Sequence, residues 1–292
     1  MGKIWELDFY SRPILDENKK KLWEVLICES PTTVDTDLNS LFRYSQFCGN
    51  QEVNSITLAK AIDRAIKESG EAPSKIRFFR KQMNNMIKKG CEAVGIPAVA
   101  SRRTYFLQQW LAERMANFYP QQAGYDETAS TSGGIQYLPT TPIALPDALR
   151  GDRNDKWALV TLQAGELREM GEWDIAFGEA FPLEMASISD ETKIPGLLVF
   201  SSRALPLAAW MSGLELAHLR LEREKTNPPC LCLETGASDS WILASITDNN
   251  TLEEALGFER VKKKANGVHF LAIQSSPSSQ SFAAFWLLLE QG

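Results

Sequence analysis

The sequence predicts an α/β fold of two similar domains, each a mixed sheet packed against helices. Segments in which apolar and polar residues alternate, as in strands, are interleaved with segments of helical periodicity along the chain. The same order of elements is predicted twice: three strands, helix, strand, helix, strand, helix. Between the two runs lies a stretch rich in proline, glycine, serine and threonine, a composition typical of linkers.

The first half begins with a strand that carries Trp5, Leu7 and Phe9 on one face. Thr57 is the expected cap of the first helix, and Gly70 closes it. Thr104 is the expected cap of a long third helix. The predicted elements of this half are strands at 4–14, 22–28, 41–47, 76–79 and 97–100 and helices at 57–70, 84–94 and 104–118.

The linker is expected at 120–156, which leaves domains at 1–119 and 157–292. In the second half Thr251 and Glu254 form a capping box at the start of a helix that ends in a cluster of three lysines. The predicted elements are strands at 157–163, 174–184, 197–201, 230–234, 240–246 and 268–273 and helices at 205–223, 251–264 and 281–289.

Three consecutive strands followed by alternating helices and strands are the order of the ribonuclease H-like fold, which is our interpretation of both halves. A nuclease of that kind needs clustered carboxylates for two magnesium ions. Asp8 and Glu6 share one face of the first strand, but Arg80 and Lys81 stand where a further acid is needed, and residues 157–163 contain none. We expect Glu6 and Asp8 to be solvated, and a metal-dependent nuclease remains the weaker alternative.

A basic island, which we define as residues 75–103, stands out from an acidic chain. It contains eight basic residues and one carboxylate, Glu92, which gives it a charge of +7. Since the whole chain has a net charge of −6, the rest of the chain carries −13. Such concentration favours one local site for an anionic partner. Two short helices with solvated outer faces would give the same count.

Single-stranded RNA requires cations for its phosphates and ring faces for its bases, and the island offers both. We therefore predict a non-enzymatic RNA-binding protein. In this hypothesis Phe79 or Tyr105 stacks a base. The predicted phosphate contacts are Arg77, Arg80, Lys81, Lys88, Lys89, Arg102 and Arg103.

The remaining reactive residues do not indicate catalysis or a cofactor. Five cysteines, an odd number without a Cys-x-x-Cys pair, indicate a reducing compartment. Cys230 and Cys232 point to the same face of a strand but have no second pair, so we predict no zinc site. His218, expected in a helix, and His269, expected in a strand, have structural roles in this interpretation, and no phosphate-binding loop or nucleophile motif is present.

The C-terminal segment allows a second hypothesis, a scaffold or assembly factor that holds other proteins. Trp286, Leu287 and Leu288 form an exposed hook for a partner in this hypothesis. Alternatively, Phe282, Phe285, Trp286 and Leu289 form one apolar stripe of a core-facing helix. The longest apolar runs, at 205–214 and 282–289, are too short to span a bilayer, so no membrane insertion is expected.

Several long motifs carry a resemblance to a known family. They are IWELDFYSRPILD (4–16), KLWEVLIC (21–28), KIRFFR (75–80), SRRTY (101–105), PDALRG (146–151) and WLL (286–288). Through these motifs, which span nearly the full chain, the sequence resembles the Tab/Atab family of RNA-binding translation activators of plant and algal chloroplasts, with relatives in cyanobacteria.

The resemblance implies a two-part protein that binds single-stranded messenger RNA, at the 5′ untranslated region, of photosystem reaction centres, above all photosystem I. It also implies a role in photosystem biogenesis, with the translation machinery or photosystem assembly factors as further partners. Because the sequence starts directly at the first strand without a transit peptide, we expect a cytoplasmic cyanobacterial member.

Overall fold

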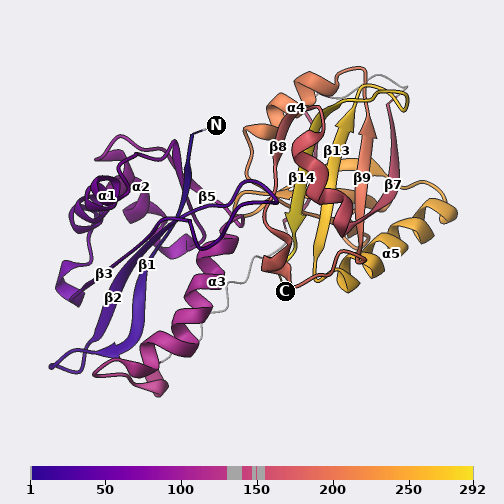
Figure 1. Cartoon of the computed structure of the whole chain (residues 1–292). Helices are drawn as coiled ribbons and strands as arrows, with labels where there is room; N and C mark the ends of the chain where they lie inside the picture. Colours follow the sequence, from indigo (N-terminus) through magenta and orange to yellow (C-terminus); the bar gives the residue numbers. More distant parts are fainter. Residues whose placement is uncertain (1, 130–139, 147–148, 150–154, 292) are drawn as a thin grey trace. The chain divides into compact units, whose positions relative to one another are not determined.

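The computed structural model describes residues 2–129, 140–146, 149 and 155–291 (Figure 1). Its chain divides into two compact units. The N-terminal unit comprises Met1–Ser30 and Leu38–Tyr137, and the C-terminal unit comprises Pro31–Asp37 and Leu138–Gly292. Within the expected linker, residues 130–139, 147–148 and 150–154 lie outside the described part of the chain.

The N-terminal unit is a five-stranded sheet in the order β3-β2-β1-β4-β5. β1, β2 and β3 are antiparallel, and β4 and β5 run parallel to β1. The predicted order of strands and helices is confirmed in this unit, whereas its ribonuclease H-like classification stays a prediction. The elements are β1 (Ile4–Leu15), β2 (Lys21–Glu29), β3 (Arg43–Cys48), α1 (Ser55–Ser69), β4 (Lys75–Phe78), α2 (Asn84–Glu92), β5 (Ala98–Ala100) and α3 (Tyr105–Glu113).

Both faces of this sheet are covered. The apolar side chains of β1, including Trp5, Leu7 and Phe9, pack against α1 and α2 in one core cluster. α3 lies on the other side of the strands (Figure 1), and the backbone N–H of Leu107 donates to Glu6 Oε2 at 2.7 Å. The alternation in β1 therefore predicted correctly which side chains share a face. The expectation that its polar face is solvated is wrong, because α3 covers that face.

Both ends of α1 are capped by residues next to the helix in the sequence. Asn54, three residues before the expected Thr57, is the N-cap, and its side chain accepts from the N–H groups of Ile56 and Thr57. At the other end Gly70 has φ +75°, a left-handed conformation that glycine adopts without strain. The helix end was thus predicted correctly and its start was placed one turn late.

The C-terminal unit contains two sheets with apolar residues of both in one core cluster. One sheet has the order β7-β9-β13-β14-β8 and the other β10-β11-β12-β6. Its strands are β6 (Ile143–Ala144), β7 (Lys156–Gln163), β8 (Ile175–Glu179), β9 (Lys193–Phe200), β10 (Leu216–Glu222), β11 (Cys230–Thr235), β12 (Asp239–Ser245), β13 (Val268–Gln274) and β14 (Phe282–Leu289), and its α-helices are α4 (Ala204–Ser212) and α5 (Asn249–Lys264).

Two predicted helices of the second half are wrong. The helix expected at 205–223 ends at Ser212, and β10 follows, with Leu219 in the core and Arg220 on the other face. The final segment, expected as a helix, is β14, which lies between β13 and β8. Since β14 is apolar on both faces, its sequence has no period that separates a buried strand from a buried helix. The C-terminal unit therefore does not repeat the N-terminal one.

Short helical segments complete the fold. α3 continues into one π-helical segment, so that the helix predicted to reach residue 118 does extend that far. The short segments are η1 (Asn50–Glu52), η2 (Lys81–Met83), η3 (Arg114–Phe118), η4 (Tyr119–Gln121), η5 (Glu127–Ala129), η6 (Ala164–Glu172) and η7 (Leu183–Ala186).

Candidate nucleic-acid interface

The two halves of the basic island meet at one edge of the N-terminal sheet. β4 and β5 are parallel neighbours, so their carboxyl ends lie at the same edge. The N–H of Ser101, just after β5, donates to the carbonyl of Phe78 at the end of β4, at 2.8 Å. Arg80 and Lys81 follow one strand, and Arg102 follows the other, at this edge.

Four of the predicted contact residues are core residues. Arg77 is 1%, Phe79 2%, Arg103 3% and Tyr105 5% exposed. Arg77 lies in β4, between β1 and β5, and the guanidinium of Arg103 lies 5.5 Å from the ring centre of Tyr105. The expectation that Phe79 or Tyr105 presents an open ring to a base is wrong, because both rings are packed inside the unit.

Arg80 is held by the protein itself. Its Nε donates to Asp8 Oδ1 at 2.6 Å, and its Nη2 donates to Asp8 Oδ2 at 3.2 Å. The guanidinium also lies 3.9 Å from the ring centre of Tyr10 and 4.9 Å from that of Phe79. Its side chain is 12% exposed. An ion pair and two aromatic rings thus occupy most of the surface that a phosphate would need.

Behind this pair lies a buried network of charges on the face that α3 covers. Arg12 Nη2 donates to Asp8 Oδ2, and Arg12 Nε donates to Glu24 Oε2, both at 2.9 Å. Glu24 also accepts from Tyr119 Oη at 2.5 Å and from Arg114. Three arginines therefore face two carboxylates, and each carboxylate is bound by two of them, which satisfies the buried charges internally.

The same network fixes the charge state of Asp8. Burial by itself would raise the pKa of this carboxyl, but the positive charges of Arg12 and Arg80 and the hydrogen bonds from both outweigh it. The pKa of Asp8 therefore lies below its usual range, and the group is an anion at neutral pH. Arg12 and Arg80 therefore remain ion-paired with Asp8 at neutral pH.

The remaining members of the predicted set are accessible. Lys81 in η2 and Lys88 and Lys89 in α2 are exposed, and Arg102 is half-buried. The inner side of α2 is buried through Ile87, Gly90 and Cys91, which turns the two lysines outward. The usable cations of the island are therefore those on the outer face of α2 and next to the strand ends.

The donor set of this unit does not suit a two-metal nuclease. Both oxygens of Asp8 are bound by guanidinium groups, and Glu6 accepts from Ser30 Oγ and from the N–H of Leu107, each at 2.7 Å. Within the described part of the chain, no group of three or more His, Cys, Asp or Glu side chains is arranged to hold a metal ion. These internal bonds leave Asp8 and Glu6 unsuited to the role of nuclease metal ligands.

The predicted C-terminal hook is part of a strand in the core. Trp286 is 3% exposed, and Leu287 and Leu288 are fully buried. Trp286 pairs with Leu271 of β13 and with Glu179 of β8. The hook hypothesis is wrong, because a side chain between two neighbouring strands has no surface left for a partner.

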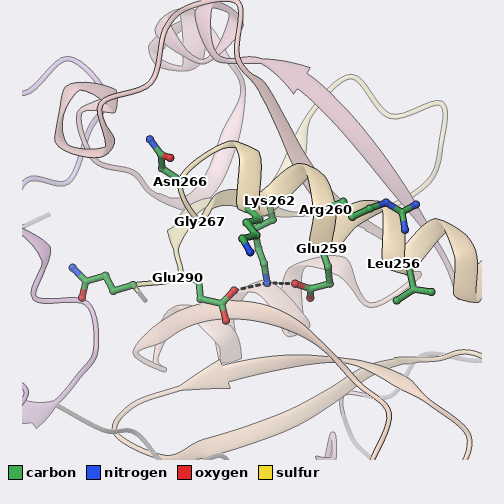
Figure 2. A pocket seen from close by; sticks show the side chains of 9 residues that line it. Leu256, Glu259, Arg260, Lys262, Asn266, Gly267 and Glu290 are labelled. Carbon is green, nitrogen blue, oxygen red and sulfur yellow. Dashed lines mark ion pairs between the residues drawn. The ribbon is translucent and has the colours of Figure 1, made fainter. Parts of the chain in front are cut away.

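The lysine cluster at the end of α5 has one structural member, which its sequence position did not reveal. A pocket of about 610 Å³ lies beside it (Figure 2). Lys262 Nζ lies 2.8 Å from Glu259 Oε2 and 2.6 Å from Glu290 Oε2, and it donates to the carbonyl of Leu219 at 2.7 Å (Figure 2). Lys262 therefore joins α5 to β10 and to the end of β14, whereas Lys263 is exposed.

Both histidines lie in strands. His269 is fully buried, its Nε2 accepts from the N–H of Leu219 at 2.8 Å, and its Nδ1 lies 2.8 Å from the carbonyl of Gly267. Burial and the charge of Lys262 hold its pKa well below the usual value, so the ring is neutral. His218, expected in a helix, is in β10, 3.6 Å from Glu290.

No helix within the described ranges is long and apolar enough to cross a membrane.

Comparison with known proteins identifies the family. Residues 4–114 match the family described as RNA-binding protein Tab2/Atab2 N terminal, and residues 132–289 match RNA-binding protein Tab2/Atab2, C-terminal domain. The chain is 37% identical to the Protein TAB2 homolog, chloroplastic, of Arabidopsis thaliana, over 99% of this chain and 75% of the relative. It is 36% identical to the protein of the same name from Zea mays, over 98% and 71%. No solved structure matches it. The chain belongs to the Tab2/Atab2 family of RNA-binding proteins.

Proposed function

We propose that this protein binds single-stranded messenger RNA through the outer face of α2 and the adjoining strand ends. Lys81, Lys88, Lys89 and Arg102 contact phosphates in this proposal. The observation that carries it is the match of both halves of the chain to a family described as RNA-binding. The exposed lysines support its location, because they belong to a +7 segment of an otherwise acidic protein.

The bound RNA in this proposal is the 5′ untranslated region of a photosystem reaction-centre transcript, and binding activates its translation. This part rests on the family resemblance of the motifs at 4–16, 21–28 and 75–80. Both relatives are named as chloroplastic proteins. For this chain we propose the cytoplasm of a cyanobacterial cell, a reducing compartment, which is supported by five cysteines that are all free thiols.

The salt dependence of RNA affinity tests the location. A double variant, Lys88→Ala/Lys89→Ala, removes two phosphate contacts, and the slope of log affinity against log salt falls by about 0.7 for each. The matched control is Lys19→Ala/Lys20→Ala, which removes two exposed lysines from the turn between β1 and β2. Equal slopes for the wild type and both variants would show that the lysines of α2 do not contact RNA phosphates.

The identity of the RNA is tested in the cell that makes the protein. The full chain is purified with its bound RNA under low salt, and the RNA is sequenced. The proposal expects enrichment of the leader of a reaction-centre transcript, and loss of that enrichment in Lys88→Ala/Lys89→Ala. RNA in proportion to its cellular abundance would contradict a specific messenger target.

A further inference from the structure

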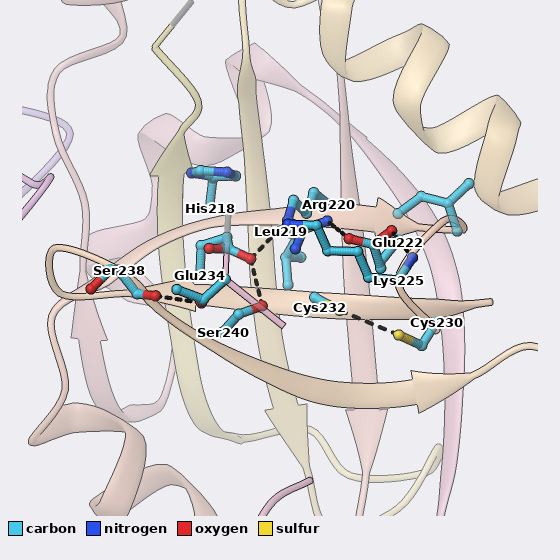
Figure 3. Close-up of polar contacts among 12 residues, drawn as sticks. His218, Leu219, Arg220, Glu222, Lys225, Cys230, Cys232, Glu234, Ser238 and Ser240 are labelled. Atoms are coloured by element: carbon cyan, nitrogen blue, oxygen red, sulfur yellow. Dashed lines mark hydrogen bonds and ion pairs between the residues drawn. The ribbon is translucent and has the colours of Figure 1, made fainter. Parts of the chain in front are cut away.

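Two thiols of the C-terminal unit are in contact. Cys230 and Cys232 lie two residues apart on β11, so their side chains share one face of the strand. Their Sγ atoms are 3.3 Å apart (Figure 3). All five cysteines are buried free thiols.

The shared face is the polar face of its sheet. The alternate residues of β11, Leu231 and Leu233, point into the hydrophobic core. On the face of the thiols, Cys232 pairs with Arg220 and Cys230 pairs with Glu222 across to β10 (Figure 3). Cysteines that only fill space belong in apolar surroundings, as Cys48 and Cys91 do in the N-terminal core. The position beside Arg220 is not of that kind.

The backbone geometry permits a bond between these thiols. Two residues of a strand span about 6.6 Å, and the Cα atoms of a disulfide lie up to about 6.8 Å apart. A disulfide also needs Cβ atoms about 3.5–4.5 Å apart, which is closer than alternate residues of a regular strand, so the bond forms only with a local distortion of β11. β11 already departs from regular pairing between Leu231 and Cys232, where its register with β12 shifts. A disulfide formed with such a distortion is strained, and strained disulfides are the easily reduced, reversible ones.

We propose that Cys230 and Cys232 are a redox-active dithiol, which a small disulfide such as oxidised glutathione converts into an intrastrand disulfide. One thiolate attacks the oxidant, forms a mixed disulfide and releases one glutathione thiolate. The second thiolate then attacks the protein sulfur of the mixed disulfide and releases the other. The two thiol protons end on two glutathione thiols, and the two electrons of the dithiol reduce the oxidant.

Local opening controls the rate of this reaction. Cys230 is 1% exposed and Cys232 fully buried, and burial raises the pKa of Cys232, which keeps its thiolate scarce. Cys230, however, directly follows a segment, 223–229, in which most residues are exposed. Fraying of this strand start exposes Cys230 first, so the oxidant reacts there and Cys232 closes the bond.

The experiment uses the folded full chain, and it is independent of RNA binding. The protein is incubated with oxidised glutathione at mildly alkaline pH and is then unfolded in denaturant, because all five thiols are buried in the folded chain. The remaining thiols are alkylated, and intact mass and peptides are measured. The expected product has lost two hydrogen atoms, carries three alkyl groups and contains a Cys230–Cys232 bond. A reducing agent restores five alkylation sites.

Three variants complete the test. Cys230→Ser and Cys232→Ser each prevent the loss of hydrogen and leave a glutathione adduct at the remaining thiol, whereas Cys91→Ser, in the N-terminal core, still forms the bond. The wild-type rate rises in urea below the unfolding transition. Five alkylated cysteines after long oxidation, or a bond between other cysteines in the folded chain, would overturn the proposal.

Discussion

Asp8 on β1 accepts two hydrogen bonds from Arg80, at 2.6 Å and 3.2 Å, across a gap of 72 residues in the sequence. The pair joins the middle of β1 to the second residue beyond the end of the neighbouring strand β4. An arginine that composition assigns to RNA is therefore part of the folded unit's internal charge balance. This division between structural and accessible cations decides what each substitution in the island does.

Arg80→Ala is expected to lower the free energy of unfolding, and this effect comes ahead of any effect on RNA affinity. Removing one partner of a buried ion pair leaves Asp8 with Arg12 alone, at a cost of about 3 kcal/mol. Urea unfolding of the full chain measures it. Lys81→Ala, at the exposed neighbour, is the control and changes the unfolding free energy by no more than about 0.5 kcal/mol. If Arg80→Ala left stability unchanged and lowered only RNA affinity, Arg80 would be a surface contact after all.

Glu222 gives the C-terminal unit a defined acid sensitivity. Burial acts to raise the pKa of this carboxyl, but hydrogen bonds from Arg220 at 2.6 Å and from the N–H groups of Glu224 and Lys225 lower it to about 2. The unfolded value is about 4.3. A carboxyl whose pKa is lower in the folded state stabilises above the unfolded pKa, and this stability is lost as pH falls from about 4.3 towards about 2.

The variant Glu222→Gln is therefore less stable than wild type at neutral pH, and the difference shrinks as pH falls through that window. Unfolding free energies measured at several pH values test this. The control Glu224→Gln changes a neighbouring exposed side chain whose backbone N–H still donates to Glu222. A difference between wild type and Glu222→Gln that stays constant with pH speaks against the lowered pKa.

Gly196 is required by a close approach of β9 to an aromatic ring. A Cβ at this position would lie 2.3 Å from atoms of the Phe270 ring, which itself stacks on Phe285. Gly196→Ala therefore overpacks the sheet and is expected to cost about 1–3 kcal/mol. Gly171→Ala meets nothing within 4 Å and serves as the control. If the double variant Gly196→Ala/Phe270→Leu recovered part of the lost stability, the cost would come from the clash with the ring. If Gly196→Ala were as stable as wild type, the close approach of the ring would be refuted.

The sequence predicted the N-terminal unit better than the C-terminal one for a physical reason. In β1 the residues Trp5, Leu7 and Phe9 alternate with polar ones, and the period of two identifies both the strand and its core face. Alternation does not say what lies on the other face, which is why the burial of Glu6 and Asp8 was missed. β14 has no alternation at all, so its sequence does not distinguish a buried strand from a buried helix.

The sequence predicted which segment holds the candidate site, but not which of its cations are accessible. Counting charges located the island, but the partner of Arg80 is 72 residues away in the sequence, and only the sheet brings Asp8 to it. Likewise the contact that fixes Lys262 comes from Glu290 at the end of another strand. Which cations remain for a phosphate depends on such distant partners, so Lys88 and Lys89 could be separated from Arg77 only by the structure.

Trp286 provides the sharpest contrast between a hook for a partner and a core residue. Trp286 lies in a strand and is only 3% exposed. Trp286→Ala therefore leaves a cavity between the sheets and is expected to lower the free energy of unfolding by about 3–5 kcal/mol. The control is Leu205→Ala on α4, a large apolar side chain that is 58% exposed and whose loss changes stability by no more than about 0.5 kcal/mol. Urea unfolding compares the two. A Trp286→Ala variant as stable as wild type would mean that the indole is on the surface and would restore the hook, because only a side chain outside the core is removed without a cavity.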